Sequence, residues 1–348
     1  MPPCENSKGT SCARCGSGAP PIHAIRNDTL HYCSDCLIAA TLKRARATLL
    51  SALSPRSLDL GCRLAVAVSS PRLDGSSGWF AWYLLTNHVK HLGRQGLDVG
   101  AVHVRFDGDA DVGSLEPDAE SLPRVVTLDG RALATVDDPT GREDLRRLLV
   151  RNALAQELRR GDLDCIVLGD TADALAAGAV SRAAKGQGHL LGDVGMPKEG
   201  FAYIMRDLGK DWVAACGRAF SLPGVEDSAE GNRVAGNGVH AKNLHDLARA
   251  FAAQLLRSNP GGVSNILGTA AKLEGSAAGG KACGLCGEVL ADGEAGNRAG
   301  VCDACTIGVF GGWHDETRAA RTMALLPAEI RSGCMVDAKS PTMITDGH

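Results

Sequence analysis

The sequence has few aromatic residues and no long uncharged apolar run. Of its 348 residues only 4% are aromatic, whereas 43 are glycine, so a core must be built mainly from alanine, valine and leucine. No segment approaches the roughly 18 consecutive apolar residues that a membrane-spanning helix needs. The N-terminal MPPCENSKGTSC also lacks the apolar centre of a secretion signal. We therefore expect a cytoplasmic protein that makes no membrane contact.

An excess of positive charge is also missing. The formal net charge is -3, so any RNA contact requires local basic patches rather than the charge of the whole chain. With 44% hydrophobic and 22% charged residues, the composition is that of a globular protein with a sizeable core. A chain of this length can form one large domain or two moderate ones.

Cysteine, in contrast, is abundant, with 13 residues. Thiols stay reduced in the cytoplasm, where paired cysteines more often bind metal than form disulfides. Eight cysteines form Cys-x-x-Cys pairs, separated by 17 residues in the first group (16–32) and by 15 in the second (287–301). This spacing is typical of a tetrahedral zinc ribbon and predicts two Cys4 zinc sites. The expected ligands are Cys12, Cys15, Cys33 and Cys36 in the first site, and Cys283, Cys286, Cys302 and Cys305 in the second.

Three roles stay open for these two cysteine modules: a structural zinc ion, a docking or RNA-contacting surface, and a redox or iron–sulfur site. A structural ion can supply on the order of 10 kcal/mol to a lobe too small to fold alone, which favours the first role. The other cysteines lack partners at metal-binding spacing, and we interpret them as buried or incidental thiols. They are Cys4, Cys62, Cys165, Cys216 and Cys334.

Short apolar runs alternate with helical patterns between the two cysteine groups. Strands are predicted at residues 63–68, 99–106, 125–128, 165–168 and 202–205. Helices are predicted at residues 77–92, 141–160, 172–184 and 211–220. Strands that alternate with helices of this length indicate an α/β fold with a parallel sheet covered on both faces.

The chain after this sheet is expected to be less regular. Residues 223–238 have the composition of a linker, a helix is predicted at 240–256, and SNPGGVSN (258–265) is expected to break it. Residues 274–281 form a flexible lead into the second cysteine group, and the tail after about residue 326 is expected to be disordered.

The segment AVAVSSPRLDGSSGWFAWYLL, residues 65–85, is predicted as a strand, a polar turn and a helix. It resembles the loop of PP-loop ATP pyrophosphatases, in which a strand ends in Ser-Gly-Gly-x-Asp-Ser and the glycines let the backbone approach phosphates. Here Ser70 and Pro71 stand in the glycine positions, and Pro71 has no N–H to donate. We therefore predict a degenerate loop, with altered nucleotide binding and a working ATP site as open alternatives. Its candidate residues are Ser69, Asp74, Gly75, Ser76 and Ser77.

The order of the motifs carries a family resemblance. CARCG, YCSDC and TLKRARATLL precede the degenerate loop, and VLGDTADALAAGAVSRAAKGQG, YIMRDL, CGLC and CDAC follow it. Over about residues 10–310 the chain resembles the cytoplasmic tRNA 2-thiolation protein 2 family. The resemblance implies a PP-loop (adenine nucleotide alpha hydrolase-like) α/β domain flanked by N- and C-terminal Cys4 zinc-ribbon modules.

The resulting domain prediction divides the chain into five parts. They are residues 1–50 (the first cysteine module and a basic helix), 58–222 (the degenerate PP-loop domain), 223–275 (a linker and a helix), 276–312 (the second cysteine module) and 313–348 (a tail).

The resemblance also implies a heterodimer. The catalytic partner, thiolation protein 1, is expected to adenylate wobble uridine and to take sulfur from a ubiquitin-related carrier. Active relatives have central cysteines that include a Cys-x-x-Cys pair, whereas the centre of this chain offers only Cys165 and Cys216. We therefore predict a non-catalytic, tRNA-binding partner subunit that binds zinc but not ATP. The alternatives are an ATP-dependent tRNA sulfurtransferase with an atypical PP-loop, and a zinc-dependent protein adaptor without RNA contact.

Basic side chains supply the predicted tRNA contacts, because they neutralise phosphates and make binding salt-dependent. A solvated surface charge is the alternative for each of them. Arginines of the 141–160 helix rank lower, since Glu143, Asp144 and Glu157 dilute their charge. The higher-ranked residues flank the first cysteine module or the expected strand ends, where open α/β sheets bind ligands. They are Lys43, Arg44 and Arg46, and Arg182, Lys185 and Arg206.

Overall fold

The computed structural model describes most of the predicted α/β region and parts of both ends. The described residues are 11–18, 23–25, 30–53, 61–68, 77–89, 96–107, 124–195, 200–222, 241–273, 283, 285, 301–302, 305–306, 309, 316–328 and 330. Among these residues, no helix combines the length and the apolar character needed to cross a lipid bilayer.

A five-stranded parallel sheet forms the centre of the molecule. Its spatial order is β5-β4-β3-β6-β7. The chain thus adds β4 and β5 on one side of β3, and then β6 and β7 on the other side. The bounds are β3 (Cys62–Val68), β4 (Leu97–Phe106), β5 (Arg124–Leu128), β6 (Cys165–Leu168) and β7 (Phe201–Ala202). The direction of building reverses between β3 and β6, which makes their carboxyl ends the switch point of the sheet.

The central strand β3 is apolar on both sides because helices cover both faces of the sheet. Val66 pairs with Ala101 of β4 and with Val167 of β6. Six of the seven residues in CRLAVAV are buried or half-buried, and only Arg63 is exposed. Such near-continuous burial is typical of a parallel sheet.

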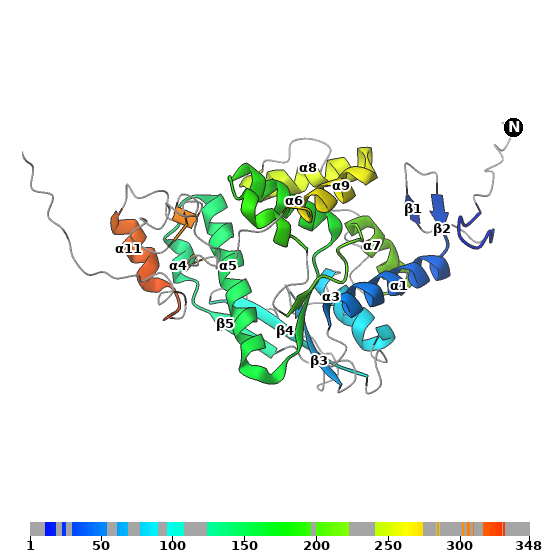
Figure 1. Cartoon of the computed structure of the whole chain (residues 1–348), viewed down its shortest axis with the longest axis horizontal. Helices are drawn as coiled ribbons and strands as arrows, with labels where there is room; N and C mark the ends of the chain where they lie inside the picture. Colours follow the sequence, from blue (N-terminus) through cyan, green and yellow to red (C-terminus); the bar gives the residue numbers. More distant parts are fainter. Residues whose placement is uncertain are drawn as a thin grey trace, which may run out of the picture.

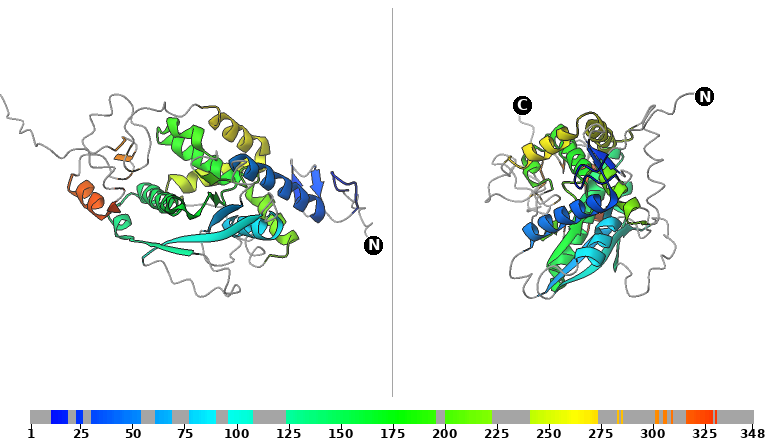
Figure 2. Two further views of the ribbon diagram at one scale, coloured as in Figure 1. Left: turned by 60° about the horizontal axis from the view of Figure 1, so that its bottom comes forward. Right: turned by 90° about the vertical axis from the view of Figure 1, so that its right-hand side faces the viewer.

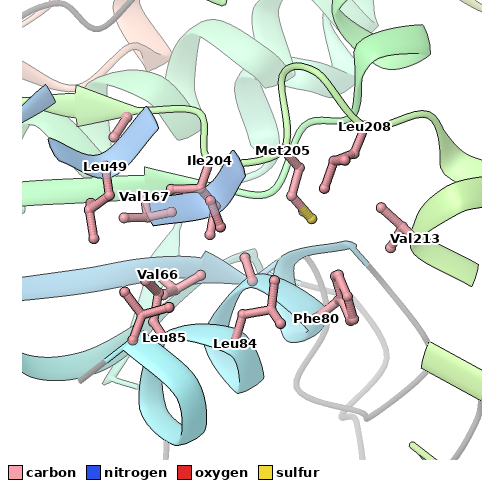
Figure 3. Close-up of a cluster of buried hydrophobic side chains, with 14 of the residues drawn as sticks. Leu49, Val66, Phe80, Leu84, Leu85, Val167, Ile204, Met205, Leu208 and Val213 are labelled. Atoms are coloured by element: carbon pink, nitrogen blue, oxygen red, sulfur yellow. The ribbon is translucent and has the colours of Figure 1, made fainter. Parts of the chain in front are cut away.

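One face of the sheet is covered by α1 (Ser34–Ala52), α3 (Ser77–Leu84) and α7 (Lys210–Ala219). The main hydrophobic core lies between these helices and the sheet. Figure 3 shows Val66 and Val167 of the strands packed among side chains of the covering helices. The core residues that the covering segments contribute include Leu49, Phe80, Leu84, Leu85, Ile204, Met205, Leu208 and Val213. A π-helical turn, Leu85–Val89, continues α3.

The opposite face is covered by α5 (Pro139–Glu157), which follows the short helix α4 (Arg131–Ala134). Leu154 of α5 packs on Ala65, Val102 and Ile166. Side chains alternate between the two faces along a strand, so these three residues face away from the main core. The Asp138 carboxylate accepts a hydrogen bond from the Gly141 N–H at 2.6 Å and so caps α5, whose first residue is proline. A π-helical turn, Leu158–Asp162, ends the segment.

Three helices form a further layer: α6 (Ala172–Ala184), α8 (Leu244–Ser258) and α9 (Pro260–Ala270). Figure 1 shows α8 and α9 alongside α6, and their alanine, valine and leucine side chains share one core. A short 3-10 helix, Gly188–Asp193, follows α6. Segment 258–265 separates two helices, as expected, but most of it belongs to the second helix, α9. Pro260 is the first residue of α9, where its missing N–H costs no helical hydrogen bond.

The two ends of the described chain lie far apart. The N-terminal strands β1 (His23–Ile25) and β2 (Leu30–Tyr32) form an antiparallel hairpin at one end of the long axis. Helix α11 (Glu316–Leu325) lies at the other end (Figures 1 and 2), and the described C-terminal cysteines share a hydrophobic cluster with Leu326, directly after α11. Helix α11 contacts α4. The sequence pattern did not indicate this helix, which lies within the segment predicted as a tail, residues 313–348.

The predicted elements of the sheet are confirmed with small shifts. The strand at 165–168 and the helix at 172–184 agree with the prediction at both ends. The strand predicted at 202–205 is shorter, because only Phe201–Ala202 pairs with β6. The predicted linker at 223–238 and the lead at 274–281 lie outside the described residues.

Candidate metal centres and the carboxyl edge of the sheet

The N-terminal cysteines converge as their spacing predicts. Cys12 and Cys15 lie on a turn, Cys33 directly precedes α1, and Cys36 lies in its first turn. Their four sulfur atoms lie within 4.8 Å of one another. The Cys15 and Cys33 sulfurs are 3.8 Å apart, which matches the edge of a tetrahedron with zinc–sulfur bonds of about 2.3 Å. The site therefore fits a single tetrahedral ion.

The electrostatics of this cluster also suit a cation. Backbone N–H groups, foremost that of Cys33, lower the pKa of Cys12 to about 6 and favour its thiolate. Burial and then the neighbouring thiols raise the pKa of Cys36 to about 12. Four adjacent thiolates repel one another, so a divalent cation is needed for all four to ionise together.

The C-terminal cluster is built from Cys283, Cys302 and Cys305, whose sulfurs also lie within 4.8 Å of one another. The Cys302 N–H donates to the Cys283 sulfur at 3.3 Å, and the Cys305 N–H donates to the Cys302 sulfur at 3.4 Å. Such N–H···S bonds stabilise thiolate ligands. The predicted fourth ligand, Cys286, lies outside the described residues.

The cysteines of the sheet and its covering helices differ from those of the two clusters in that they are single buried thiols. Burial raises the pKa of Cys62 and of Cys165 to about 12, and that of Cys216 to about 11. Each is at most 1% exposed. A buried thiol with a raised pKa is neither a nucleophile nor a sulfur carrier at neutral pH, so the structure agrees with the interpretation of these residues as buried thiols.

Two glycines bring the start of α3 against the switch point. A Cβ atom on Gly169, directly after β6, would lie 2.5 Å from the Gly78 backbone nitrogen. A Cβ on Gly78 would lie 2.9 Å from the Ala67 carbonyl oxygen of β3. The first turn of α3, which begins at Ser77, therefore packs on the ends of both strands. The other predicted loop residues, Ser69, Asp74, Gly75 and Ser76, lie outside the described residues.

The predicted RNA-contacting residues of α1 are all exposed. The Arg44 guanidinium lies 4.7 Å from the ring centre of Trp212, and Arg46 donates to the His88 carbonyl oxygen at 2.9 Å. Arg44 is thus held against α7 and Arg46 against the π-helical turn after α3. The cluster follows the N-terminal metal site along the same helix.

The second predicted group is more enclosed. Lys185 is only 15% exposed, and its ammonium donates to the Asp144 carboxylate at 2.7 Å. Arg182 donates to the Leu190 carbonyl oxygen at 3.0 Å, and Arg206 lies 3.8 Å from the Asp207 carboxylate. These three side chains are therefore held by partners within the chain to a greater degree than Lys43 is.

A buried polar network escaped the sequence analysis. His245 of α8 lies 2.7 Å from the Asp144 carboxylate through Nε2 and 3.1 Å from the Ser181 hydroxyl through Nδ1. This order resembles a hydrolase triad, but Ser181 is 1% exposed, so no substrate reaches its oxygen. The network instead joins α5, α6 and α8. No local signal indicates it, because His245 and Asp144 are 101 residues apart.

Asp170, the second residue after β6, was also missed. Although Asp170 is an exposed residue, the surrounding protein raises the pKa of its carboxyl group by desolvation, which the charges of Arg147, Arg151 and Arg182 oppose. Alternation along the strand end places Gly169 toward α3 and Asp170 toward α5. The carboxyl edge thus has a glycine-packed side and a charged side.

The strand order, the glycine-packed start of α3 and the terminal cysteine clusters define the class: an α/β fold with a five-stranded parallel sheet and cysteine sites suited to zinc in both terminal regions. Among solved structures, the chain is similar to the U34-tRNA thiolase NcsA from Methanococcus maripaludis with its 4Fe-4S cluster. The TM-score is 0.53 at 15% sequence identity, over 87% of this chain and 96% of that one. No protein-family model and no curated protein sequence matches the chain. The likeness to NcsA concerns the fold, and it confirms the predicted PP-loop fold class.

Proposed function

We propose that this chain is the non-catalytic, tRNA-binding subunit of a heterodimer that 2-thiolates wobble uridine in cytosolic tRNAs. Its partner is the catalytic thiolation protein 1, and the sulfur comes from a ubiquitin-related carrier. Support comes from the PP-loop fold, which the chain shares with a U34-tRNA thiolase. The order of sequence motifs adds to this support.

The state of the central thiols carries the proposal that this subunit is non-catalytic. Sulfur transfer needs an accessible thiolate, whereas Cys62, Cys165 and Cys216 are buried and have raised pKa values. Within the described part of the chain, the other cysteines belong to the two metal clusters. The subunit then contributes binding and positioning, and the partner performs the sulfur chemistry.

Zinc is the proposed ion in both cysteine clusters, and Lys43, Arg44 and Arg46 are proposed to contact tRNA phosphates. The first cluster would fix the start of α1, from which these side chains extend. Arg182, Lys185 and Arg206 are retained as a second group, of which Lys185 would first have to leave Asp144.

One observation favours a second candidate, an ATP-dependent tRNA sulfurtransferase with an atypical PP-loop. Helix α3 begins at the switch point, where free N–H groups of a helix start favour phosphate. The isolated chain would then bind ATP, and substitution of Asp74 and Ser76 would abolish that binding. A non-catalytic subunit does not need this site.

Reconstitution of the reaction tests the proposal. Wobble-uridine thiolation would be measured with ATP and a sulfur donor for this chain, for its partner, and for both. We expect activity only in the mixture, with the double variant Asp74→Ala/Ser76→Ala as active as the unmodified subunit. Activity of this chain alone, lost in the double variant, would instead establish the second candidate.

A further inference from the structure

The guanidinium of Arg151, on α5, is held in one orientation by two residues at the end of β7. Its central carbon lies 3.8 Å from the ring centre of Phe201, and Nη1 donates to the Tyr203 hydroxyl at 2.8 Å. Phe201 and Tyr203 are 2% and 8% exposed, so both supports are themselves fixed by packing. Stacking on an aromatic ring leaves the planar edge of a guanidinium free to bind ligands.

Most of the donors of Arg151 remain available. A guanidinium has five N–H groups, and within the described chain only the bond to Tyr203 uses one of them. No described carboxylate forms an ion pair with Arg151, although Arg147, one turn earlier, pairs with Glu143 at 2.9 Å. The fold has therefore already ordered this side chain, which lowers the entropy cost of binding an anion there.

The surroundings of Arg151 are positively charged. The charges of Arg147 and Arg182 act on the Asp170 carboxyl group together with that of Arg151, although Arg147 is itself paired with Glu143. The other nearby carboxylate of α5, Asp144, is engaged by Lys185 and His245. A phosphate group would therefore meet a net attraction beside Arg151.

The location is that of a ligand site in an open α/β sheet. Arg151 contacts Phe201 of β7 and Tyr203, which directly follows that strand, and Asp170 follows the carboxyl end of β6. Ligands of this architecture bind outside these strand ends. The group lies on the α5 side of the sheet, whereas Lys43, Arg44 and Arg46 belong to α1 on the other side.

We propose that Arg151, assisted by Arg147 and Arg182, forms a phosphate-binding site at this edge and that its ligand is a phosphodiester of the RNA backbone. The choice of RNA rests on the proposed function, whereas the phosphate chemistry rests on the guanidinium geometry. Together with α1, the site gives the subunit phosphate contacts on both sides of the sheet.

RNA affinity measured against salt concentration tests this site. The full-length, metal-loaded chain would be titrated with a tRNA transcript, alone and with its partner. Arg151→Gln should weaken binding about fivefold to tenfold and lower the salt slope by about one. Arg151→Lys, which keeps the charge but not the planar fork, should lie between. Asp170→Asn should strengthen binding about twofold to fivefold, since it removes the opposing charge.

Arg63→Gln is the matched control. It removes the same charge at the amino end of β3, where Arg63 forms an exposed pair with Asp98 at 3.6 Å. Its affinity and salt slope should equal those of the unmodified chain. Unchanged circular dichroism and thermal midpoints would establish that Arg151→Gln and Arg151→Lys remain folded.

Inorganic pyrophosphate and ATP serve as small-ligand probes and separate the two sources of phosphate. If tRNA binds and neither the Arg151 nor the Asp170 variants differ from Arg63→Gln, the site is overturned while the proposed function survives. If tRNA does not bind but pyrophosphate binds and is lost in Arg151→Gln, the phosphate site stands and the proposed RNA role fails. If the unmodified chain binds none of the probes, both are overturned.

Discussion

The two cysteine clusters have the same Cys-x-x-Cys design but different surroundings. In the N-terminal cluster Cys15 is exposed and Cys36 half-buried, and a short hairpin and the start of α1 are the adjoining elements. In the C-terminal cluster Cys283, Cys302 and Cys305 are at most 4% exposed.

The neighbours of the C-terminal cysteines explain this contrast. They pack with Phe106 of β4, Leu145 and Leu149 of α5, and Leu326 after α11, and so belong to a hydrophobic core. A metal ion there would stabilise the α/β unit itself. An ion at the N-terminal cluster would stabilise a peripheral lobe, so the same paired Cys-x-x-Cys design leads to two different structural roles.

The largest expected effect is that of Cys302→Ser. It removes a ligand and leaves a polar group in the core, and loss of a buried metal site belongs to the substitutions that cost about 4 kcal/mol or more of unfolding free energy. Cys15→Ser, at the exposed site, should leave the main unfolding transition within about 1 kcal/mol of the unmodified chain. Urea titration followed by circular dichroism measures both, and equal losses would remove the distinction between the clusters.

Chelation should proceed in two phases. The exposed cluster should lose its ion first with little change in helix content, and the core cluster later, together with loss of α4, α5 and α11. A metal-sensitive dye recorded alongside circular dichroism would resolve the phases. Cys15→Ser should abolish the fast phase and leave the slow one, whereas a single phase in the unmodified chain would contradict the assignment.

The attachment of the N-terminal lobe to the sheet should depend on Thr41. Its buried hydroxyl donates to the Leu37 carbonyl oxygen at 2.9 Å and accepts from the Trp212 indole N–H at 2.8 Å. Thr41→Val removes this acceptor of the indole N–H and should cost about 1–3 kcal/mol of unfolding free energy. The control is Thr86→Val, whose hydroxyl bonds only within its own helical segment. Equal stabilities of the two variants would show that α1 is held by apolar packing alone.

The smallest effect concerns pH and the helices beside the C-terminal core. Burial raises the pKa of Asp144, but hydrogen bonds from His245 and Lys185 outweigh it and hold the pKa below its usual value of 3.8. The resulting stability is present above that value and is lost as the pH falls through the lower folded-state pKa. Asp144→Asn should therefore flatten the pH dependence of urea unfolding below about pH 4. A curve parallel to that of the unmodified chain would exclude this contribution.

The sequence was most informative where one local pattern determines the structure. The apolar runs at 63–68 and 165–168 predicted buried parallel strands, and the cysteine spacing predicted that Cys12 and Cys33 meet. Pro260 was interpreted as a breaker although it begins a helix, because the same residue type serves both purposes. The pair formed by Asp144 and His245 was beyond prediction, since it arises only when α5 and α8 pack together.

The site at Arg151 illustrates the same limit. Acidic neighbours along α5 predicted that its arginines are offset surface charges. In the fold Glu143 pairs with Arg147, Asp144 with Lys185 and His245, and Glu157 with Arg124 and Arg160. Arg151 is instead stacked on Phe201. Separation along the sequence therefore does not predict which acidic and basic side chains pair. The tertiary packing of the helices determines the pairs.

The most direct test of the central claim is to follow sulfur during thiolation. The heterodimer would be incubated with a thiocarboxylated carrier, ATP and tRNA, and persulfides on each chain would be located by mass spectrometry after rapid quenching. The account predicts that Cys62, Cys165 and Cys216 of this chain remain unmodified while tRNA is thiolated. A persulfide on any of the three that forms and decays at the rate of turnover would contradict it.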